Sequence, residues 1–194
     1  MKSKYYQFQS LPKAYSGDAH FYRLVNGEPV VNCSAVILSD KLAVTAGHCV
    51  ASDPIMAAYM AALNIQERLE IVQGEELIVV EAVAYPHVDV AIVRGDFVNL
   101  KKAKISPTLM FDRNTDYKVC GYPHDRKNSI CVDLGRPAIN NKEQMGFNAG
   151  IVSGMSGSGV YDNKGQVVGI AVSVGNYQVG GRSYAQPLSG LIGD

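Results

Sequence analysis

The sequence predicts an all-β protein, and three observations favour that fold class. The 194-residue chain contains short apolar stretches rich in β-branched residues, each long enough for one strand. Turn-forming residues separate these stretches, and the 19 glycines are spread along the chain. No internal repeat or linker divides the sequence. Many short strands joined by turns indicate a barrel or a sandwich.

Seven segments carry the strand pattern most clearly. They are residues 30–38, 42–46, 76–84, 88–93, 117–122, 158–162 and 166–174. Between the last two, Asp162-Asn163-Lys164-Gly165 predicts a hairpin turn, because asparagine and glycine tolerate the positive φ angles of tight turns.

One segment, residues 53–70, carries conflicting signals. Asp53 is a suitable helix N-cap, Pro54 suits a first turn, and the alanines and methionines that follow favour a helix. Apolar residues also alternate between positions 55 and 61, as they do in a strand. The residues alone leave both interpretations open.

Composition argues against several classes of protein. Lys+Arg and Asp+Glu both number 18, so nothing indicates a surface for nucleic acid or an anionic membrane. No segment reaches the roughly 18 apolar residues of a membrane span, and the opening residues lack the apolar core of a secretory signal. We expect a secreted protein only if the first residue is a processed mature end, and otherwise a cytoplasmic or virion-associated one.

The four cysteines, Cys33, Cys49, Cys120 and Cys131, can pair in three ways. They form no CxxC motif, and no second ligand pair complements the adjacent His48 and Cys49. The sequence therefore predicts no metal and no cofactor. Disulfides and free buried thiols both fit the sequence, because the redox compartment decides between them.

Three short motifs carry residues suited to acyl transfer. His48 follows an apolar strand, Asp89 leads into another, and Ser156 stands between glycines. A serine becomes a good nucleophile when a base takes its proton, and the base needs a buried acid to fix its tautomer. Each motif alone has an ordinary structural explanation. Together, in the order His, Asp, Ser, they predict a catalytic triad.

These motifs resemble the three signatures of the chymotrypsin-like (trypsin-fold) serine peptidases. The matching residues are TAGHC at 45–49, the aspartate at 89 before VAIV, and GMSGSG at 154–159. The resemblance covers about residues 20–190 and is nearer the compact bacterial and viral branches than the zymogen-activated trypsins. It implies one peptidase domain of two six-stranded antiparallel β-barrels, at about residues 18–100 and 112–185, with the active site in the cleft between them. It also implies that residues 56–64 are mainly strand.

The resemblance implies a serine endopeptidase that hydrolyses a polypeptide through an acyl-enzyme, without metal or cofactor. His48 would act as the base, Asp89 would orient it, and Ser156 would attack the substrate. The backbone N–H groups of Gly154 and Ser156 would stabilise the oxyanion.

The resemblance also bears on the cysteines and on activation. It implies a Cys33–Cys49 disulfide that closes the histidine loop, while Cys120–Cys131 would staple the hairpin around Gly121-Tyr122-Pro123. Zymogens of the trypsin type have an aspartate before the nucleophile, where this chain has Met155. We therefore expect no activation by pairing with a new N-terminus.

Specificity is also inferred by resemblance. The base of the S1 pocket would be Gly150, six residues before the nucleophile, followed by Ile151. The opposite wall would consist of Ser173, Val174 and Gly175, and Ser173 matches the serine that hydrogen-bonds to the catalytic aspartate. None of these positions is charged, so we expect an uncharged, apolar P1 residue. Arg182 would favour an acidic P1 residue if it pointed inward.

A second hypothesis belongs to another class of protein. The chain would be a catalytically silent trypsin-fold module that serves as a binding or structural component of a larger assembly, such as a viral one. The intact motifs argue against it, because an inert protein has no chemical reason to keep all three residues. The sequence does not predict an oligomeric state.

Overall fold

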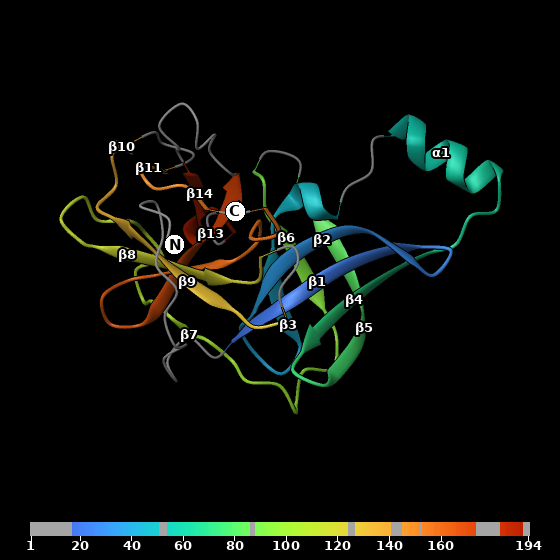
Figure 1. Ribbon diagram of the computed structural model, residues 1–194, viewed down its shortest axis with the longest axis horizontal. Helices are drawn as coiled ribbons and strands as arrows, with labels where there is room; N and C mark the ends of the chain where they lie inside the picture. Colours follow the sequence, from blue (N-terminus) through green and yellow to red (C-terminus); the bar gives the residue numbers. More distant parts are fainter. Residues whose placement is uncertain are drawn as a thin grey trace.

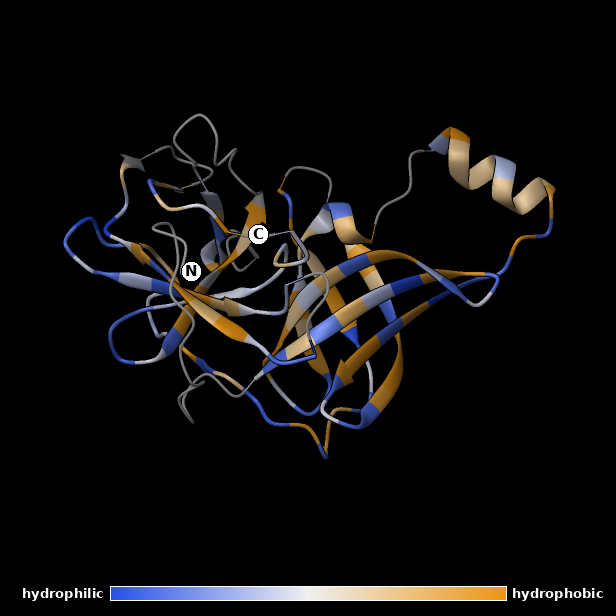
Figure 2. Ribbon diagram, in the orientation of Figure 1, coloured by the Kyte–Doolittle hydropathy of each residue, from blue (hydrophilic) through white to orange (hydrophobic). Residues whose placement is uncertain are grey.

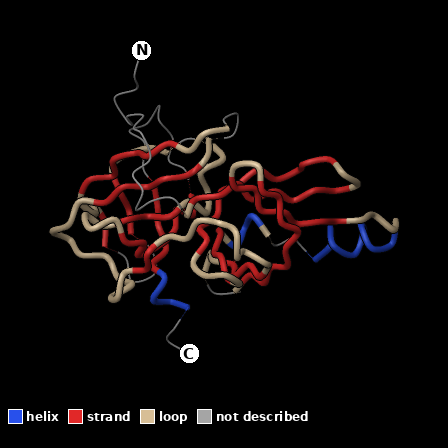
Figure 3. Tube along the Cα trace, turned by 90° about the horizontal axis from the view of Figure 1, so that it is seen from below, coloured by secondary structure: helices blue, strands red, loops and turns tan. Residues whose placement is uncertain are grey.

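The computed structural model describes residues 17–50, 54–85, 88–123, 127–140, 145–151, 153–173 and 183–191. Its secondary structure is almost entirely β, which confirms the predicted fold class. Figures 1 and 3 show two lobes of strands side by side, with one helix, α1, projecting from the lobe that contains β1 to β6.

Six strands close the first lobe into a barrel in the order β1-β2-β3-β6-β5-β4. They are β1 (Asp18–Val25), β2 (Glu28–Ile37), β3 (Leu42–Thr45), β4 (Glu67–Gln73), β5 (Glu76–Ala84) and β6 (Ala91–Arg94). Thr45, the last residue of β3, pairs with Ala91, the first residue of β6. The segment after β3 and the segment before β6 therefore lie together at one rim of the barrel, and these segments carry His48 and Asp89.

The second lobe is an eight-stranded sheet with the main order β10-β11-β14-β13-β12-β8-β9, and β7 pairs in parallel with β13. Its strands are β7 (Lys104–Ile105), β8 (Tyr117–Gly121), β9 (Ile130–Gly135), β10 (Ile139–Asn140), β11 (Met145–Phe147), β12 (Gly159–Tyr161), β13 (Gln166–Ser173) and β14 (Ser183–Pro187), followed by the 3-10 turn η4 (Leu188–Leu191). Pairings among the described residues curl this sheet into a half-barrel and do not close it into a full ring. The predicted turn joins β12 to β13, with the N–H of Gly165 bonded to the Asp162 carbonyl at 3.1 Å.

Two apolar clusters fill the lobes. The first fills the closed barrel and extends into the second lobe through side chains such as Tyr161 and Ile170, both 0% exposed. The second fills the curled sheet and includes Ile151 and Met155, which are also 0% exposed. The core of the second lobe therefore anchors the loop that carries Ser156.

Residues 54–62 form the helix α1 (Pro54–Ala62), so the strand expected over 56–64 is wrong. Local helix preference prevails because the segment pairs with none of the described strands. Asn64, at φ 57°, ends α1 in a Schellman motif, with the N–H of Ile65 bonded to the Met60 carbonyl at 2.9 Å. The strand that closes the barrel comes later, as β4, and pairs with both β1 and β5.

Helix α1 is apolar around its circumference and largely uncovered, as Figure 2 shows. Met60 is its buried residue and lies 4.0 Å from Nη2 of Arg23, measured at Sδ. Ile55 and Tyr59 are 81% and 59% exposed. Of the helices in the described part of the chain, none has the length and apolar character needed to cross a membrane.

Two disulfides join neighbouring segments, with the pairings expected above. Cys33 in β2 is bonded to Cys49 in the 3-10 turn η2 (Gly47–Cys49), and Cys120 in β8 is bonded to Cys131 in β9. The first bond fastens the turn that carries His48 to the wall of the barrel.

Asp18 is a buried carboxyl group at the boundary between the two lobes. It opens β1 and accepts, on Oδ1, a 2.9 Å hydrogen bond from the hydroxyl of Tyr161 in β12. Its Oδ2 is buried and has no hydrogen-bond partner in the described part of the protein. Burial therefore raises the pKa of Asp18 well above its ordinary value, although the bond from Tyr161 acts in the opposite direction.

We expect Asp18→Asn to flatten the pH dependence of stability. The folded pKa lies above the ordinary value of 3.8, so the contribution of this carboxyl is complete below that value and is lost as the pH rises through the folded pKa. Asparagine does not ionise. As the pH rises above 3.8, the free energy of unfolding should therefore fall less in this variant than in the wild type, measured by denaturant titration. Asp133→Asn, which changes an exposed carboxylate in β9, is the control, and a wild-type slope in Asp18→Asn would contradict the expectation.

Candidate active site

His48 and Asp89 form a closely held pair at the rim of the barrel. His48 lies in η2 directly after β3, and Asp89 lies in the bend before β6. Oδ2 of Asp89 is 2.7 Å from Nδ1 of His48, and Oδ1 accepts the backbone N–H of His48, also at 2.7 Å. An ionised carboxylate only accepts hydrogen bonds, so Nδ1 carries a proton. In the neutral ring the lone pair is then on Nε2.

The pair shifts both pKa values in the directions that favour opposite charges. The side-chain hydrogen bond to Asp89 raises the pKa of His48, although partial burial opposes this. Burial alone would raise the pKa of Asp89, but hydrogen bonds from the His48 ring and from the backbone N–H groups of His48 and Gly47 leave that pKa lowered. Gly47 also makes room for the carboxylate, because a Cβ there would lie 3.0 Å from Oδ1 of Asp89.

Glycines shape the loop between β11 and β12, which carries Ser156. Gly154 and Gly157 have φ angles of 95° and 88°, which residues with side chains rarely adopt. A Cβ at Gly157 would also lie 2.0 Å from the carbonyl oxygen of Ser34 and 2.3 Å from Oγ1 of Thr45. The loop therefore approaches Ser34 within β2 and Thr45 at the end of β3 at a distance that only glycine permits.

Ser34, in β2, ties this loop to the first lobe. Its N–H donates to the Ser156 carbonyl at 2.8 Å, and its hydroxyl donates to the Gly154 carbonyl at 3.0 Å. The same hydroxyl oxygen accepts the N–H of Tyr122, which follows β8, at 2.9 Å. Ser34 was not among the predicted site residues, and its only sequence signal is its place beside Cys33.

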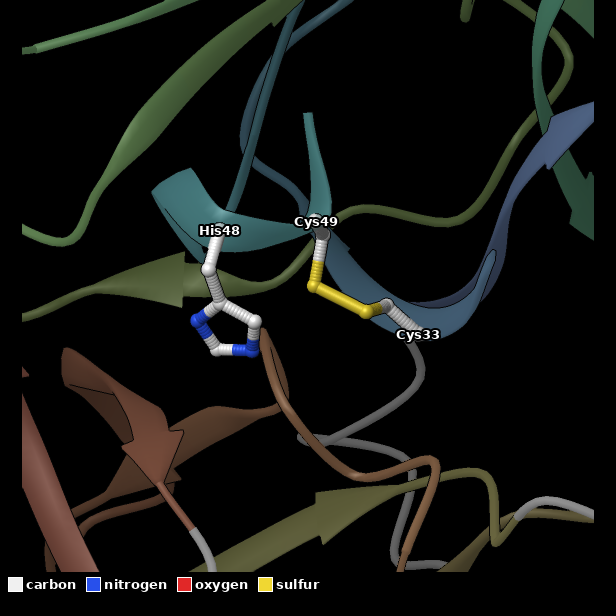
Figure 4. Close-up of side chains that lie close together, drawn as sticks. All are labelled: Cys33, His48 and Cys49. Atoms are coloured by element: carbon white, nitrogen blue, oxygen red, sulfur yellow. A yellow bond between two sulfur atoms is a disulfide. The ribbon is translucent and has the colours of Figure 1, made fainter. Parts of the chain in front are cut away.

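The environment of Ser156 leaves several groups free for a ligand. The N–H groups of Gly154 and Ser156 form no hydrogen bond with the described residues, so both can donate to an oxyanion. The half-buried Ser156 hydroxyl and His48, both within the described chain, are not hydrogen-bonded to each other. In peptidases without substrate such catalytic hydrogen bonds are often long and close on substrate binding. Figure 4 shows the His48 ring pointing from η2 toward segments of the second lobe.

The predicted specificity residues lie only partly within the described chain. Gly150 and Ile151 are both buried on the segment that leads to Ser156. Ser173 ends β13, and its backbone is described while its side chain is not. Val174, Gly175 and Arg182 lie outside the described residues.

Cys33, His48 and Cys49 gather at one corner of the site (Figure 4). Both sulfurs and one ring nitrogen lie within 4.8 Å of one another. Because the two sulfurs are bonded to each other, they offer no thiolate to a metal in this state.

Comparison with known proteins identifies the family. A family model described as a trypsin-like peptidase domain matches residues 33–170. Comparison with curated protein sequences finds no match.

Three solved structures share the fold. A serine endoprotease from Yersinia pestis has a TM-score of 0.73 and 16% identity, and the match covers 93% of this chain and 61% of that one. The HtrA-type protease AlgW with a decapeptide has a TM-score of 0.69 and 15% identity, and the match covers 93% of this chain and 63% of that one. The M. tuberculosis protease Rv3671c in an inactive form has a TM-score of 0.67 and 17% identity, and the match covers 93% of this chain and 87% of that one. The chain thus spans less than two thirds of the first two proteins. At these identities the likeness shows the fold alone. The family model, by contrast, covers well over half of the chain, including positions 48, 89 and 156, so the protein belongs to the trypsin-like peptidase family.

Proposed function

We propose that the protein is a serine endopeptidase with His48, Asp89 and Ser156 as its catalytic residues. The observation that carries the proposal is the Asp89 carboxylate, which holds both the Nδ1 and the backbone N–H of His48, each at 2.7 Å. This arrangement leaves Nε2 to act as a base. The His48 side chain is 48% exposed, so a substrate can reach that nitrogen. A serine in a glycine-shaped loop at the same rim completes the set of groups that acyl transfer needs.

The proposed reaction uses these groups in turn. His48 Nε2 takes the proton of Ser156 as Oγ attacks the peptide carbonyl, and Asp89 stabilises the resulting imidazolium. The N–H groups of Gly154 and Ser156 hold the oxyanion. His48 gives its proton to the leaving amine, and water then hydrolyses the acyl-enzyme with His48 again as the base. The substrate is a polypeptide, as is the decapeptide in the similar HtrA-type protease structure.

Met155 supports a peptidase that needs no trypsin-type N-terminal pairing. Its side chain is fully buried in the apolar core of the second lobe. No charge at this position has to find a partner, so packing and the Ser34 hydrogen bonds set the conformation of the loop.

A fluorophosphonate probe, which reacts with activated serines, tests the proposal. We expect the wild type to be labelled at Ser156, Ser156→Ala not at all, and His48→Ala far more slowly, because the hydroxyl then lacks its base. Peptide mapping locates the label. A folded wild type that resists the probe would contradict the proposal and favour a catalytically silent trypsin-fold module that binds within a larger assembly.

We also propose that the enzyme prefers an uncharged, apolar P1 residue. Gly150 adds no side chain to the base of the S1 pocket, and Ile151 beside it is apolar and 0% exposed. Cleavage profiling with a peptide library should disfavour charged P1 residues by about 100-fold or more, because an unpaired charge would be buried. A preference for acidic P1 residues that disappears in Arg182→Ala would contradict this and assign Arg182 to the pocket.

A further inference from the structure

The corner formed by Cys33, His48 and Cys49 has the dimensions of a zinc site. Its three donor atoms lie within 4.8 Å of one another. Around tetrahedral zinc, bonds of about 2.3 Å to sulfur and 2.0 Å to nitrogen place donor atoms roughly 3.5–3.8 Å apart. The Cα atoms of the two cysteines are 6.4 Å apart, so side-chain rotation alone can bring the sulfurs to that spacing once their bond is broken.

His48 is already oriented as zinc-binding histidines are. Its Nδ1 donates to Asp89 at 2.7 Å, which leaves Nε2 as the ligand atom. Zinc-bound histidines almost always donate their other ring nitrogen to a carboxylate, carbonyl or water, and that partner raises the basicity of the ligand. Figure 4 shows one ring nitrogen on the side of the ring that faces the disulfide.

We propose that reduction of the Cys33–Cys49 disulfide creates a zinc site with Cys33, Cys49 and His48 as its protein ligands and water as the fourth. A dithiol supplies two electrons and two protons, becoming a disulfide itself while the two cysteines become thiols. Zn²⁺ then displaces one proton from each thiol and binds the lone pair of Nε2. Thiolate and imidazole ligands select zinc over magnesium or calcium. The metal approaches from the exposed side of His48, because Cys33 and Cys49 are 4% and 0% exposed.

Zinc on Nε2 would occupy the nitrogen that the proposed reaction uses as its base, so metal binding and hydrolysis exclude each other. The zinc site itself does not rest on the proposed function, because metal binding is measured without turnover. The second disulfide provides an internal comparison. Among the described residues, no third ligand completes a cluster with Cys120 and Cys131.

The test is a titration of the reduced protein with zinc, and with Co²⁺ as a spectroscopic substitute. A phosphine reduces both disulfides and is removed, and alkylation with intact-mass measurement verifies four thiols. We expect one zinc per reduced chain, none on the oxidised chain, and the charge-transfer and d–d bands of tetrahedral thiolate-bound cobalt. Cys120→Ser/Cys131→Ser should keep the zinc, and Cys33→Ser/Cys49→Ser should lose it. Asp89→Asn should weaken zinc affinity about 10–100-fold.

Other outcomes overturn the site. These are equal zinc binding by Cys33→Ser/Cys49→Ser, equal binding by the oxidised chain, no zinc on the reduced chain, or a reduced chain that circular dichroism shows to be unfolded. Fluorophosphonate labelling separates this proposal from the peptidase assignment. An oxidised protein that resists labelling but binds zinc once reduced contradicts the peptidase assignment alone. In a labelled protein, zinc should block the probe after reduction, and a chelator should restore labelling.

Discussion

Ser156→Ala should lower the turnover of a peptide substrate by about 10⁶-fold, the loss typical when a triad serine is removed from a serine peptidase. The effect is large because the substitution removes the hydroxyl that would attack the substrate and form the acyl-enzyme. Stability should change little, since the Ser156 side chain is only half buried and its carbonyl, which Ser34 binds at 2.8 Å, is retained. Active-site-normalised kcat, with circular dichroism to verify the fold, measures both.

Ser158→Ala is the matched control in the same loop. Ser158 is 0% exposed, and its Oγ has no hydrogen-bond partner in the described structure, so removing that hydroxyl leaves no new unpaired group. Its turnover should stay within a few-fold of the wild type. Removing His48 together with Ser156 should cost no more than removing Ser156 alone, because the two act as a unit. Near-wild-type hydrolysis by Ser156→Ala would end the assignment.

Asp89→Asn should lower turnover by about 10⁴-fold while the fold persists. An amide can donate a hydrogen bond to Nδ1 of His48, which favours the tautomer with the proton on Nε2. That tautomer cannot take the proton of Ser156. The variant thus tests the tautomer directly, and kcat/KM against a cleaved library peptide measures it.

Asp133→Asn makes the same chemical change at an exposed carboxylate in β9 and should leave kcat/KM unchanged. A loss below about 10-fold in Asp89→Asn, with the same fold, would mean that the 2.7 Å contact to Nδ1 positions nothing in the reaction.

The candidate triad could be predicted from the sequence because each of its residues lies in a short, contiguous motif. The contacts that bring these motifs together could not be predicted, because they join residues far apart in the chain. Ser34 lies 120 residues from Gly154, and its hydrogen bond to that carbonyl exists only once the lobes meet. The sequence shows that Gly157 follows Ser156, but the close approach of Gly157 to Ser34 and Thr45 also depends on tertiary structure.

The strands divide in the same way. Segments rich in β-branched residues, such as β5 and β13, form the strands that their composition and flanking turns predicted. Strand β1 was not predicted, because His20, Tyr22 and Arg23 in its middle interrupt the apolar pattern. Strands β10 and β11 have two and three residues, too few for any periodicity to register.

Helix α1 is a different case, because its local sequence favours a helix and the family resemblance led us to expect a strand over the same residues. The residues from Pro54 to Ala62 favour a helix, and Asn64 supplies the residue that ends it at φ 57°. The barrel accommodates the insertion because β4 provides the required strand a few residues later.

The hydrogen bonds of Ser34 to the Ser156 loop form part of the interface between the two lobes, and opening this interface has a free energy separate from that of global unfolding. The second lobe has an apolar cluster of its own, but the first cluster also crosses the interface through Tyr161 and Ile170, so separating the lobes breaks apolar contacts as well as these hydrogen bonds. Separation of the two lobes would move Ser156 away from the barrel rim that carries His48. Inactivation by mild denaturant at a concentration that leaves the secondary structure intact would then report such a sub-global opening.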